Sequence, residues 1–464
     1  MGRGPVAPTT GHGSWPTRAP LVLLALLTST LGVVPSVPFL ATVPAALCLA
    51  LALAGTRRRR TESRTVVPGA VATAVVGCVA AQLVMAFAFS DRPVVALLLG
   101  CACLLTGAAA VVMPRLVWCH LAAAGLLHLF HVRDLRPDID VGHFVRGSTA
   151  ALLEGRNPWA LTIPNPYSDA ETARLWAPEF VDGGRIVVGF PYLPGSVLGY
   201  VPGHLVGEVR LASVAATLAA TAIVWRMATD PVGRILVASV PLTALALLTS
   251  VNYWVEPLLV LAVAVLAWSV RRGSPAGGAV AVALLLSTKQ YALVWLPLEK
   301  LVRRTVGTRG VLAGVAAAAV LVGGAFWWSP EDFWRAVVRA QLVQPYRSDS
   351  ISLAVDLVNA GVPLPATALS IGSLLAGLGV AVWVRVTAPA TATWTVLGLG
   401  LALLGTVLLS KQAFTNYYFL IHACTVFGVA LWPEDQQGKA DPPTGAAGRR
   451  FHRSRLRLMP APRR

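Results

Sequence analysis

Apolar runs recur along almost the whole chain, and polar residues gather in the short connections between them. Most of these runs could form a helix that crosses a hydrocarbon layer ~30 Å thick. The pattern predicts an all-α polytopic membrane protein with about twelve to sixteen transmembrane helices, and about fourteen by the best count. The expected spans are a hairpin at 20–55, then 65–90, 94–113, 116–131, 211–225, 235–249, 257–270, a tight pair at 276–301, 311–328, 366–384, 394–409 and 418–432.

One polar stretch, residues 132–192, interrupts the apolar pattern. With its continuation to Glu208 it contains nine acidic residues, six arginines and no lysine. A short amphipathic helix is expected to begin near Asp140 and to end at Gly155, with Asp138 or Asp140 as its cap. Residues 193–206 contain two prolines and three glycines, so we expect an interfacial helix there. The stretch therefore predicts a large loop with juxtamembrane helices.

Positive charge follows a different distribution. The net charge is +17, and the arginines cluster in connections such as 57–60, 271–272 and 303–304 and in the tail 449–464. The positive-inside rule places these segments and both termini in the cytoplasm, and the loop on the opposite face of the plasma (cell) membrane. Because the clusters lie between spans and do not form one surface interleaved with aromatic residues, we expect no nucleic-acid partner.

This topology divides the chain into four parts. We expect a cytoplasmic tail at 1–19, additional N-terminal helices at 20–115, a membrane domain at 116–432 with its loop at 132–208, and a basic disordered tail at 433–464. The composition agrees with a membrane domain, since 56% of residues are hydrophobic, 13% are charged and the mean hydropathy is +0.67. All six cysteines lie in apolar segments, and none shares a loop with histidines at metal-ligand spacing. We therefore predict no disulfides, no metal site and no other cofactor.

The start of the loop contains the first candidates for chemistry. Asp140, or its neighbour Asp138, could act as a general base held beside the membrane. The alternative is that these carboxylates only satisfy free amides at a helix start. His143 and Arg146 are one turn apart and could bind a phosphate or a sugar. The alternative for them is a pair of solvated positions on an interfacial helix.

Further polar groups are expected at the same membrane face. Lys289 could hold a phosphate as a point charge, although a snorkelling side chain would look the same. Glu256 is unusual because it lies between two apolar spans. An aromatic residue of the 190–195 segment could contact a sugar or form part of an aromatic belt. These candidates, with neighbours that could also be plain interfacial residues, are Tyr192, Glu256, Lys289, Gln290, Tyr346, Lys411 and Asn416.

The order of these segments resembles that of the multi-spanning GT-C glycosyltransferases. Within them it is most similar to the branch of polyprenol-phosphate-mannose-dependent mannosyltransferases. The resemblance covers 116–432 and rests on five short segments, each loose alone: 138–141, 152–159, 191–194, the Lys289 turn and 346–353. The Asn252 turn departs from it, since a glutamine is expected there.

The resemblance implies a GT-C-like fold and an inverting transfer of mannose or a similar sugar. The donor would be a polyprenyl-phosphate sugar, and the acceptor a glycolipid or polysaccharide outside the cytoplasm, with membrane lipids as further partners. Asp140 would be the base, with Asp138 as its rival, and Lys289 would lie near the lipid phosphate. A transporter or flippase for a lipid-linked or polyanionic substrate is the alternative. It should place ionisable groups at mid-membrane, whereas this chain is expected to place them at the outer ends of spans.

Overall fold

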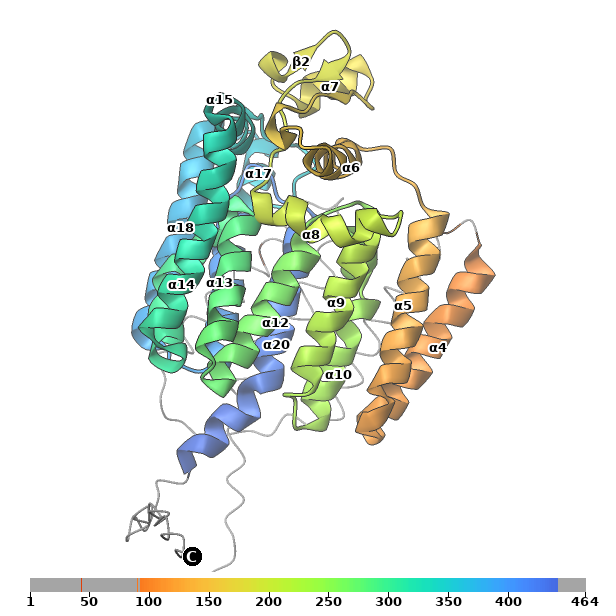
Figure 1. Cartoon of the computed structure of the whole chain (residues 1–464), viewed down its shortest axis with the longest axis vertical. Coiled ribbons are helices and arrows are strands. Elements are labelled where there is room, and N and C mark those ends of the chain that lie inside the picture. Colours follow the sequence, from red (N-terminus) through yellow and green to blue (C-terminus); the bar gives the residue numbers. More distant parts are fainter. Residues whose placement is uncertain (1–42, 44–89, 91, 441–464) are drawn as a thin grey trace, which may run out of the picture.

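The computed structural model describes residues 43, 90 and 92–440, and these fold into a body of packed helices with a smaller polar unit at one end (Figure 1). The predicted spans before residue 92 and the tail beyond residue 440 lie outside the described residues. The helices of the body are α4 (Pro93–Val112), α5 (Val117–Asp134), α9 (Arg210–Trp225), α10 (Pro231–Ser239), α11 (Ala244–Val251), α12 (Glu256–Arg272), α13 (Pro275–Thr288), α14 (Glu299–Trp328), α18 (Ala366–Thr387), α19 (Ala392–Leu408) and α20 (Thr415–Ala440).

Several of these elements are long and apolar enough to cross a membrane, which confirms the prediction of an all-α membrane protein. Within the described residues there are five such spans, or six if the bent pair α8–α9 counts as one: Pro93–Val112, Pro114–Asp134, Pro231–Val251, Gln290–Trp328 and Ala366–Thr387. This is fewer than the predicted twelve to sixteen. Part of the difference is that α13 and α19 have only 14 and 17 residues, and a helix counted as a span here has at least 18.

The second helix of the predicted tight pair at 276–301 differs from the expected α-helix. After α13 the chain turns at Lys289 and continues as the 3₁₀ helix η6 (Gln290–Leu298), which leads into α14. Helix α14 itself is broken at Gly307, whose φ of 83° no helix accommodates. Apolar periodicity alone does not distinguish a buried 3₁₀ segment from an α-helix, so this detail was not predictable.

The polar unit, residues 132–208, lies across one end of the body, here named the loop end (Figure 1). It contains α6 (Asp140–Leu153), α7 (Asp169–Leu175) and α8 (Pro194–Leu205), which meets α9 at 106°. It also contains a small antiparallel sheet that the sequence did not predict. Strands β1 (Ile163–Pro164), β3 (Arg185–Ile186) and β2 (Val181–Asp182) lie in that order.

The polar unit has an apolar core of its own. Buried rings and aliphatic side chains from α6, the sheet, α8 and α15 (Pro330–Phe333) form a cluster separate from that of the helical body. Phe144 and Trp176 pack with ring centroids 6.1 Å apart, and Trp159 and Phe333 with centroids 5.4 Å apart. These contacts fix α6 over the ends of the membrane helices, which positions Asp140.

Gly189 is the point where this core tolerates least change. Its φ is 87°, and a Cβ atom there would overlap the carbonyl oxygen of Trp159. Gly155 also has a positive φ, of 69°, but open space around it. We expect Gly189→Ala to lower the free energy of unfolding by about 2–4 kcal/mol, and Gly155→Ala by about 1 kcal/mol. Thermal unfolding in detergent would compare them, and equal losses would contradict the close contact.

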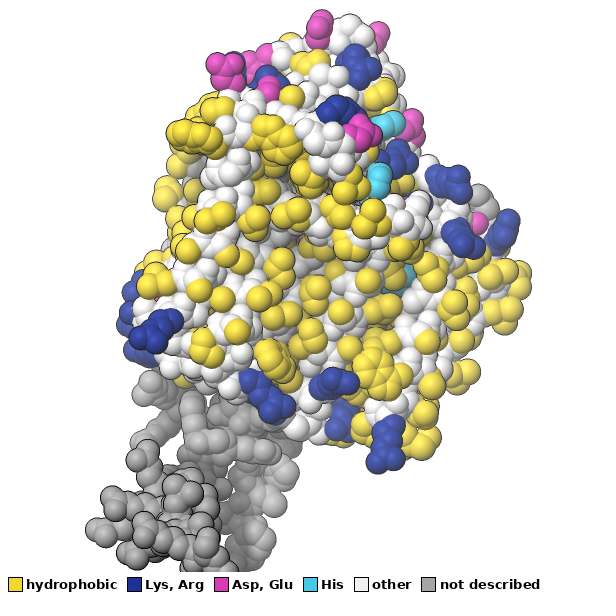
Figure 2. All heavy atoms as spheres, in the orientation of Figure 1, with side chains coloured by type: hydrophobic (Ala, Val, Ile, Leu, Met, Phe, Trp, Pro, Cys, Tyr) yellow, Lys and Arg dark blue, Asp and Glu magenta, His cyan; other side chains and the backbone are white. Residues whose placement is uncertain are grey.

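Charged residues divide between the two ends of the molecule. Figure 2 shows a broad apolar surface around the body, with Lys and Arg but few acidic side chains at the end opposite the loop end, and acidic side chains mixed with Lys and Arg at the loop end. Arg271 and Arg272 end α12 on the basic side. The last helix also runs further than predicted, since α20 continues to Ala440 and not only to 432. Glu434 to Gln437 disfavour lipid but not a helix, so the apolar pattern ends before the helix does.

Candidate functional site

Asp140 begins α6, but neither Asp138 nor Asp140 is the N-cap. That position belongs to Ile139, which has no capping side chain. The Asp140 carboxylate accepts a 2.7 Å hydrogen bond from the backbone N–H of Val141. The expected cap is therefore wrong in its position, although Asp140 does satisfy one free amide of the first turn.

The surroundings of Asp140 are those of a carboxylate available for proton transfer. Burial raises its pKa above the ordinary value for aspartate. A hydrogen bond with the Tyr167 hydroxyl, the Val141 amide and the charges of Arg347 and His143 oppose that rise without cancelling it. A half-buried carboxylate whose proton affinity is increased in this way is suited to accept a proton from a hydroxyl group.

Asp138 lies in a different environment. Its side chain is 72% exposed and pairs with the His143 ring, Oδ1 to Nε2, at 2.7 Å. His143 is thereby occupied, and the structure gives His143 and Arg146 different partners despite their helical spacing. Between the two aspartates, burial favours Asp140 for chemistry.

Lys289 and Glu256 form a buried ion pair at the loop end. The Lys289 Nζ lies 2.6 Å from the Glu256 Oε1, and the two residues are 5% and 0% exposed. The Tyr291 hydroxyl donates a second hydrogen bond to the same Oε1, at 2.9 Å. A charge this deeply buried requires a partner, and each residue provides the other's.

Three tyrosine rings surround the Lys289 ammonium group. Its Nζ lies 4.9 Å from the Tyr192 ring centroid, 5.1 Å from that of Tyr291 and 4.7 Å from that of Tyr417. Negative ring faces stabilise the cation in addition to Glu256. We name the ion pair Lys289–Glu256, together with the three tyrosine rings around it, the caged pair; it has five residues. They come from four separate chain segments that only the fold brings together.

Tyr192 connects the caged pair to Asp140. Burial raises the pKa of its hydroxyl, and the charges of Lys289, Glu256 and Asp140 all act on it. Asp140 and the caged pair are thus parts of one polar region with Tyr192 inside it. We name this region the Asp140 site.

Glu256 has one feature that its partners leave unexplained. It is the first residue of α12, where the helix dipole stabilises an anion. Its second oxygen, Oε2, is buried and has no hydrogen-bond partner in the described part of the chain. A buried polar atom without a partner is costly, and at functional sites a ligand or water often completes it.

Of the other predicted site residues, three are partly or fully buried and one lies at the surface. The Gln290 side chain donates to the carbonyl oxygens of Pro191 (2.8 Å) and Val337 (3.0 Å), which ties three segments together. Lys411 is buried and donates to the Leu342 carbonyl oxygen at 2.9 Å, and burial lowers its pKa to about 8. Asn416 is buried with its Oδ1 unpaired among the described residues, whereas Tyr346 is exposed at the surface.

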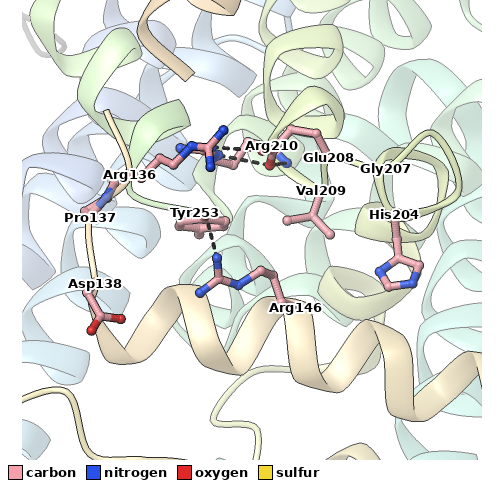
Figure 3. Close-up of a pocket in the computed structure, with 10 residues that line it drawn as sticks. All are labelled: Arg136, Pro137, Asp138, Arg146, His204, Gly207, Glu208, Val209, Arg210 and Tyr253. Atoms are coloured by element: carbon pink, nitrogen blue, oxygen red, sulfur yellow. Dashed lines mark hydrogen bonds and ion pairs between the residues drawn. The ribbon is translucent and has the colours of Figure 1, made fainter. Parts of the chain in front are cut away.

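Arg146 lies at a separate cavity, of about 750 Å³, on the other side of α6 (Figure 3). Its guanidinium group donates to the Tyr253 hydroxyl at 3.2 Å and lies 5.1 Å from the ring centroid. The buried Arg210 covers the same ring at 4.8 Å and pairs with Glu208 through two hydrogen bonds. Sequence reasoning missed Tyr253 and Arg210, and it missed Tyr167 beside Asp140, because none of them has a distinctive local pattern.

Comparison with known proteins adds no further constraint. No protein-family model, no curated protein and no solved structure matches this chain significantly. In the described residues no group of three or more His, Cys, Asp or Glu side chains is placed to hold a metal ion.

Proposed function

We propose that this chain is a membrane glycosyltransferase that uses a polyprenyl-phosphate sugar, with mannose or a similar sugar as the transferred group. The observation that supports this best is a half-buried Asp140 with a raised pKa, whose charge reaches Tyr192 of the caged pair, at one end of an apolar helical body. Such an arrangement suits a donor whose lipid tail lies along the helices and whose phosphate and sugar reach the loop end.

In the proposed reaction, Asp140 accepts the proton of an acceptor hydroxyl group. The hydroxyl oxygen forms a bond to the anomeric carbon while the bond from that carbon to the phosphate oxygen breaks, so the configuration inverts. Negative charge then develops on the lipid phosphate. Arg347, whose charge acts on Asp140, and the caged pair with its tyrosine hydroxyls are the groups available to stabilise it.

The proposed location is the extracytoplasmic face of the cell membrane. Lys and Arg at the opposite end have few acidic neighbours, whereas at the loop end they are mixed with acidic side chains, so the positive-inside rule assigns the opposite end to the cytoplasm. A donor carried by a membrane lipid agrees with that location, because nucleotide sugars are cytoplasmic. The acceptor would be a glycolipid or a polysaccharide of the cell envelope.

The direct test is sugar transfer by the purified full-length chain in detergent. Polyprenyl-phosphate sugars would be offered as donors, with a panel of glycolipid and polysaccharide acceptors, and product would be measured by mass spectrometry. Transfer with inversion supports the proposal. Hydrolysis or transfer from nucleotide sugars alone would contradict the lipid-linked donor.

The pH dependence of transfer tests the environment of Asp140. The base must be ionised, so kcat/KM is expected to rise with pH through the raised pKa of Asp140. Arg347 lowers that pKa, hence Arg347→Gln should move the acid limb to higher pH. Arg156→Gln, at the far end of α6, is the control. An unchanged acid limb in Arg347→Gln would show that Asp140 is not the group observed.

A transporter is the second candidate, and the buried pair Glu256–Lys289 favours it. Ionisable groups enclosed by membrane helices are common in transport pathways, and the unpaired Oε2 of Glu256 could take part in one. Counterflow of a lipid-linked sugar in liposomes, in the absence of any transfer product, would support this candidate. Transfer by the protein in detergent, where no gradient exists, would contradict it.

A further inference from the structure

The cavity on the other side of α6 has a composition that the Asp140 site does not explain. Its lining includes three arginines and one histidine against two carboxylates: Arg136, Arg146, Arg210, His204, Asp138 and Glu208 (Figure 3). Arg146 follows Asp140 by six residues, which puts the two about 120° apart around α6. The cavity and the Asp140 site therefore open on different faces of that helix.

Pairing inside the cavity leaves an excess of positive charge. Arg210 is 2% exposed and its charge is matched by Glu208, which accepts its hydrogen bonds at 2.9 and 2.8 Å. Asp138 is paired with His143. The guanidinium group of Arg146 donates only to the neutral Tyr253 hydroxyl, and no partner is present for the Arg136 side chain among the described residues.

Burial opposes ionisation of Glu208, but the hydrogen bonds and charge of Arg210 outweigh burial, so the pKa of Glu208 is lowered. The charge of Arg146 also lowers this pKa. The charge of Arg146 thus reaches the cavity, while its hydrogen-bond partner is the neutral Tyr253 hydroxyl. Two guanidinium groups with free donors in one concave space match the oxygens of a phosphate group.

The backbone at the cavity wall is held in an unusual conformation. Tyr253 has a φ of 61°, and it is the sole described residue other than glycine with a positive φ. Figure 3 shows its ring between Arg210 and Arg146. Gly142 of α6 packs against the same ring, where a Cβ atom would lie 3.1 Å from it. Strain of this kind persists where the surroundings fix it, and the ring that it positions contacts Arg146.

The rim of the cavity has the character of a membrane interface. His204 is followed at once by Leu205 and Val206, which are 70% and 68% exposed. Helix α8 lies across the ends of the membrane helices and bends by 106° into α9. A ligand with a phosphate group in the cavity could place its acyl chains against these exposed side chains and the apolar belt below.

We propose that this cavity binds the phosphate-bearing headgroup of an anionic membrane lipid. Arg146 and Arg136 contact the phosphate oxygens, and Leu205 and Val206 contact the start of the acyl chains. The site does not depend on sugar transfer, so it stands or falls separately from the proposed function.

The test is binding of fluorescent phosphatidylglycerol to the full-length protein in a neutral detergent, with phosphatidylcholine and soluble glycerol phosphate as competitors. We expect unlabelled phosphatidylglycerol to displace the fluorescent probe, and phosphatidylcholine and glycerol phosphate to displace it at least about tenfold more weakly. Equal competition by phosphatidylcholine would overturn recognition of net charge. Equal competition by glycerol phosphate would overturn the lipid as the source of the phosphate.

Variants assign the binding to this cavity. Arg146→Gln and Arg136→Gln should each weaken binding about ten- to a hundredfold, the range expected for losing a charged hydrogen-bond partner. Arg174→Gln removes an exposed positive charge on α7 at the same end and should leave binding unchanged. Arg136 is exposed and unpaired, so its variant should fold even if the Arg146 variant does not. Unchanged binding in Arg136→Gln, or an equal loss in Arg174→Gln, would overturn the proposal.

Discussion

Asp140→Asn is expected to reduce the rate of sugar transfer by about 10²–10⁴-fold, with little change in the binding of donor. The asparagine side chain keeps the size of the aspartate and can still accept the Val141 hydrogen bond, but it cannot accept a proton from the acceptor hydroxyl. The loss should therefore appear in kcat and not in KM. Initial rates at saturating donor would measure it.

Asp138→Asn is the matched control. It makes the same chemical change two residues away, on a side chain that is mostly exposed and paired with His143. We expect a change of less than about threefold, in keeping with the small energy of an exposed pair. A large loss in Asp138→Asn with none in Asp140→Asn would move the base to Asp138.

Stability separates a catalytic role for Asp140 from a structural one. Because its pKa is raised in the folded protein, the ionised carboxylate disfavours folding at pH values above the pKa of the unfolded chain. Asp140→Asn should consequently not lower the melting temperature at pH 7. Loss of transfer together with a lower melting temperature would indicate a structural role.

The hydrophobic pattern was sufficient for the helical body and for the position of the polar unit. The span expected at 366–384 is α18, which ends at Thr387, and the helix expected after residue 140 ends at Leu153, before Gly155. Both follow from local rules, since apolar runs set the spans and breakers end them. The length of η6 and the small sheet depended on tertiary contacts, for which the local sequence has no signal.

The site was predictable only as a set of candidates. Lys289 and Glu256 could be noticed as charges between apolar spans, but they are 33 residues apart, and their pairing depends on how α12 and α13 pack. Tyr167 follows Asp140 by 27 residues, with the rest of α6 and strand β1 between them. Packing of distant segments selects such partners, so sequence identifies the unusual residues without their contacts.

The largest expected effect on stability concerns the caged pair. Glu256→Gln would leave the Lys289 ammonium group buried without an opposite charge, and tyrosine rings alone do not replace a carboxylate. We expect the free energy of unfolding to fall by about 3–5 kcal/mol. Lys289→Met should cost a similar amount, because Glu256 would then be the unpaired charge.

The double variant Glu256→Gln, Lys289→Met distinguishes a charge pair from two independent contacts. It removes both charges at nearly constant volume, so its unfolding free energy should lie within about 1–2 kcal/mol of the original protein and above that of either single variant. Denaturant unfolding in mixed micelles would complete this cycle. Additive losses would mean that each residue stabilises the fold through other contacts. Recovery of stability without recovery of transfer would show that the pair is retained for the reaction, since a neutral replacement of it folds equally well.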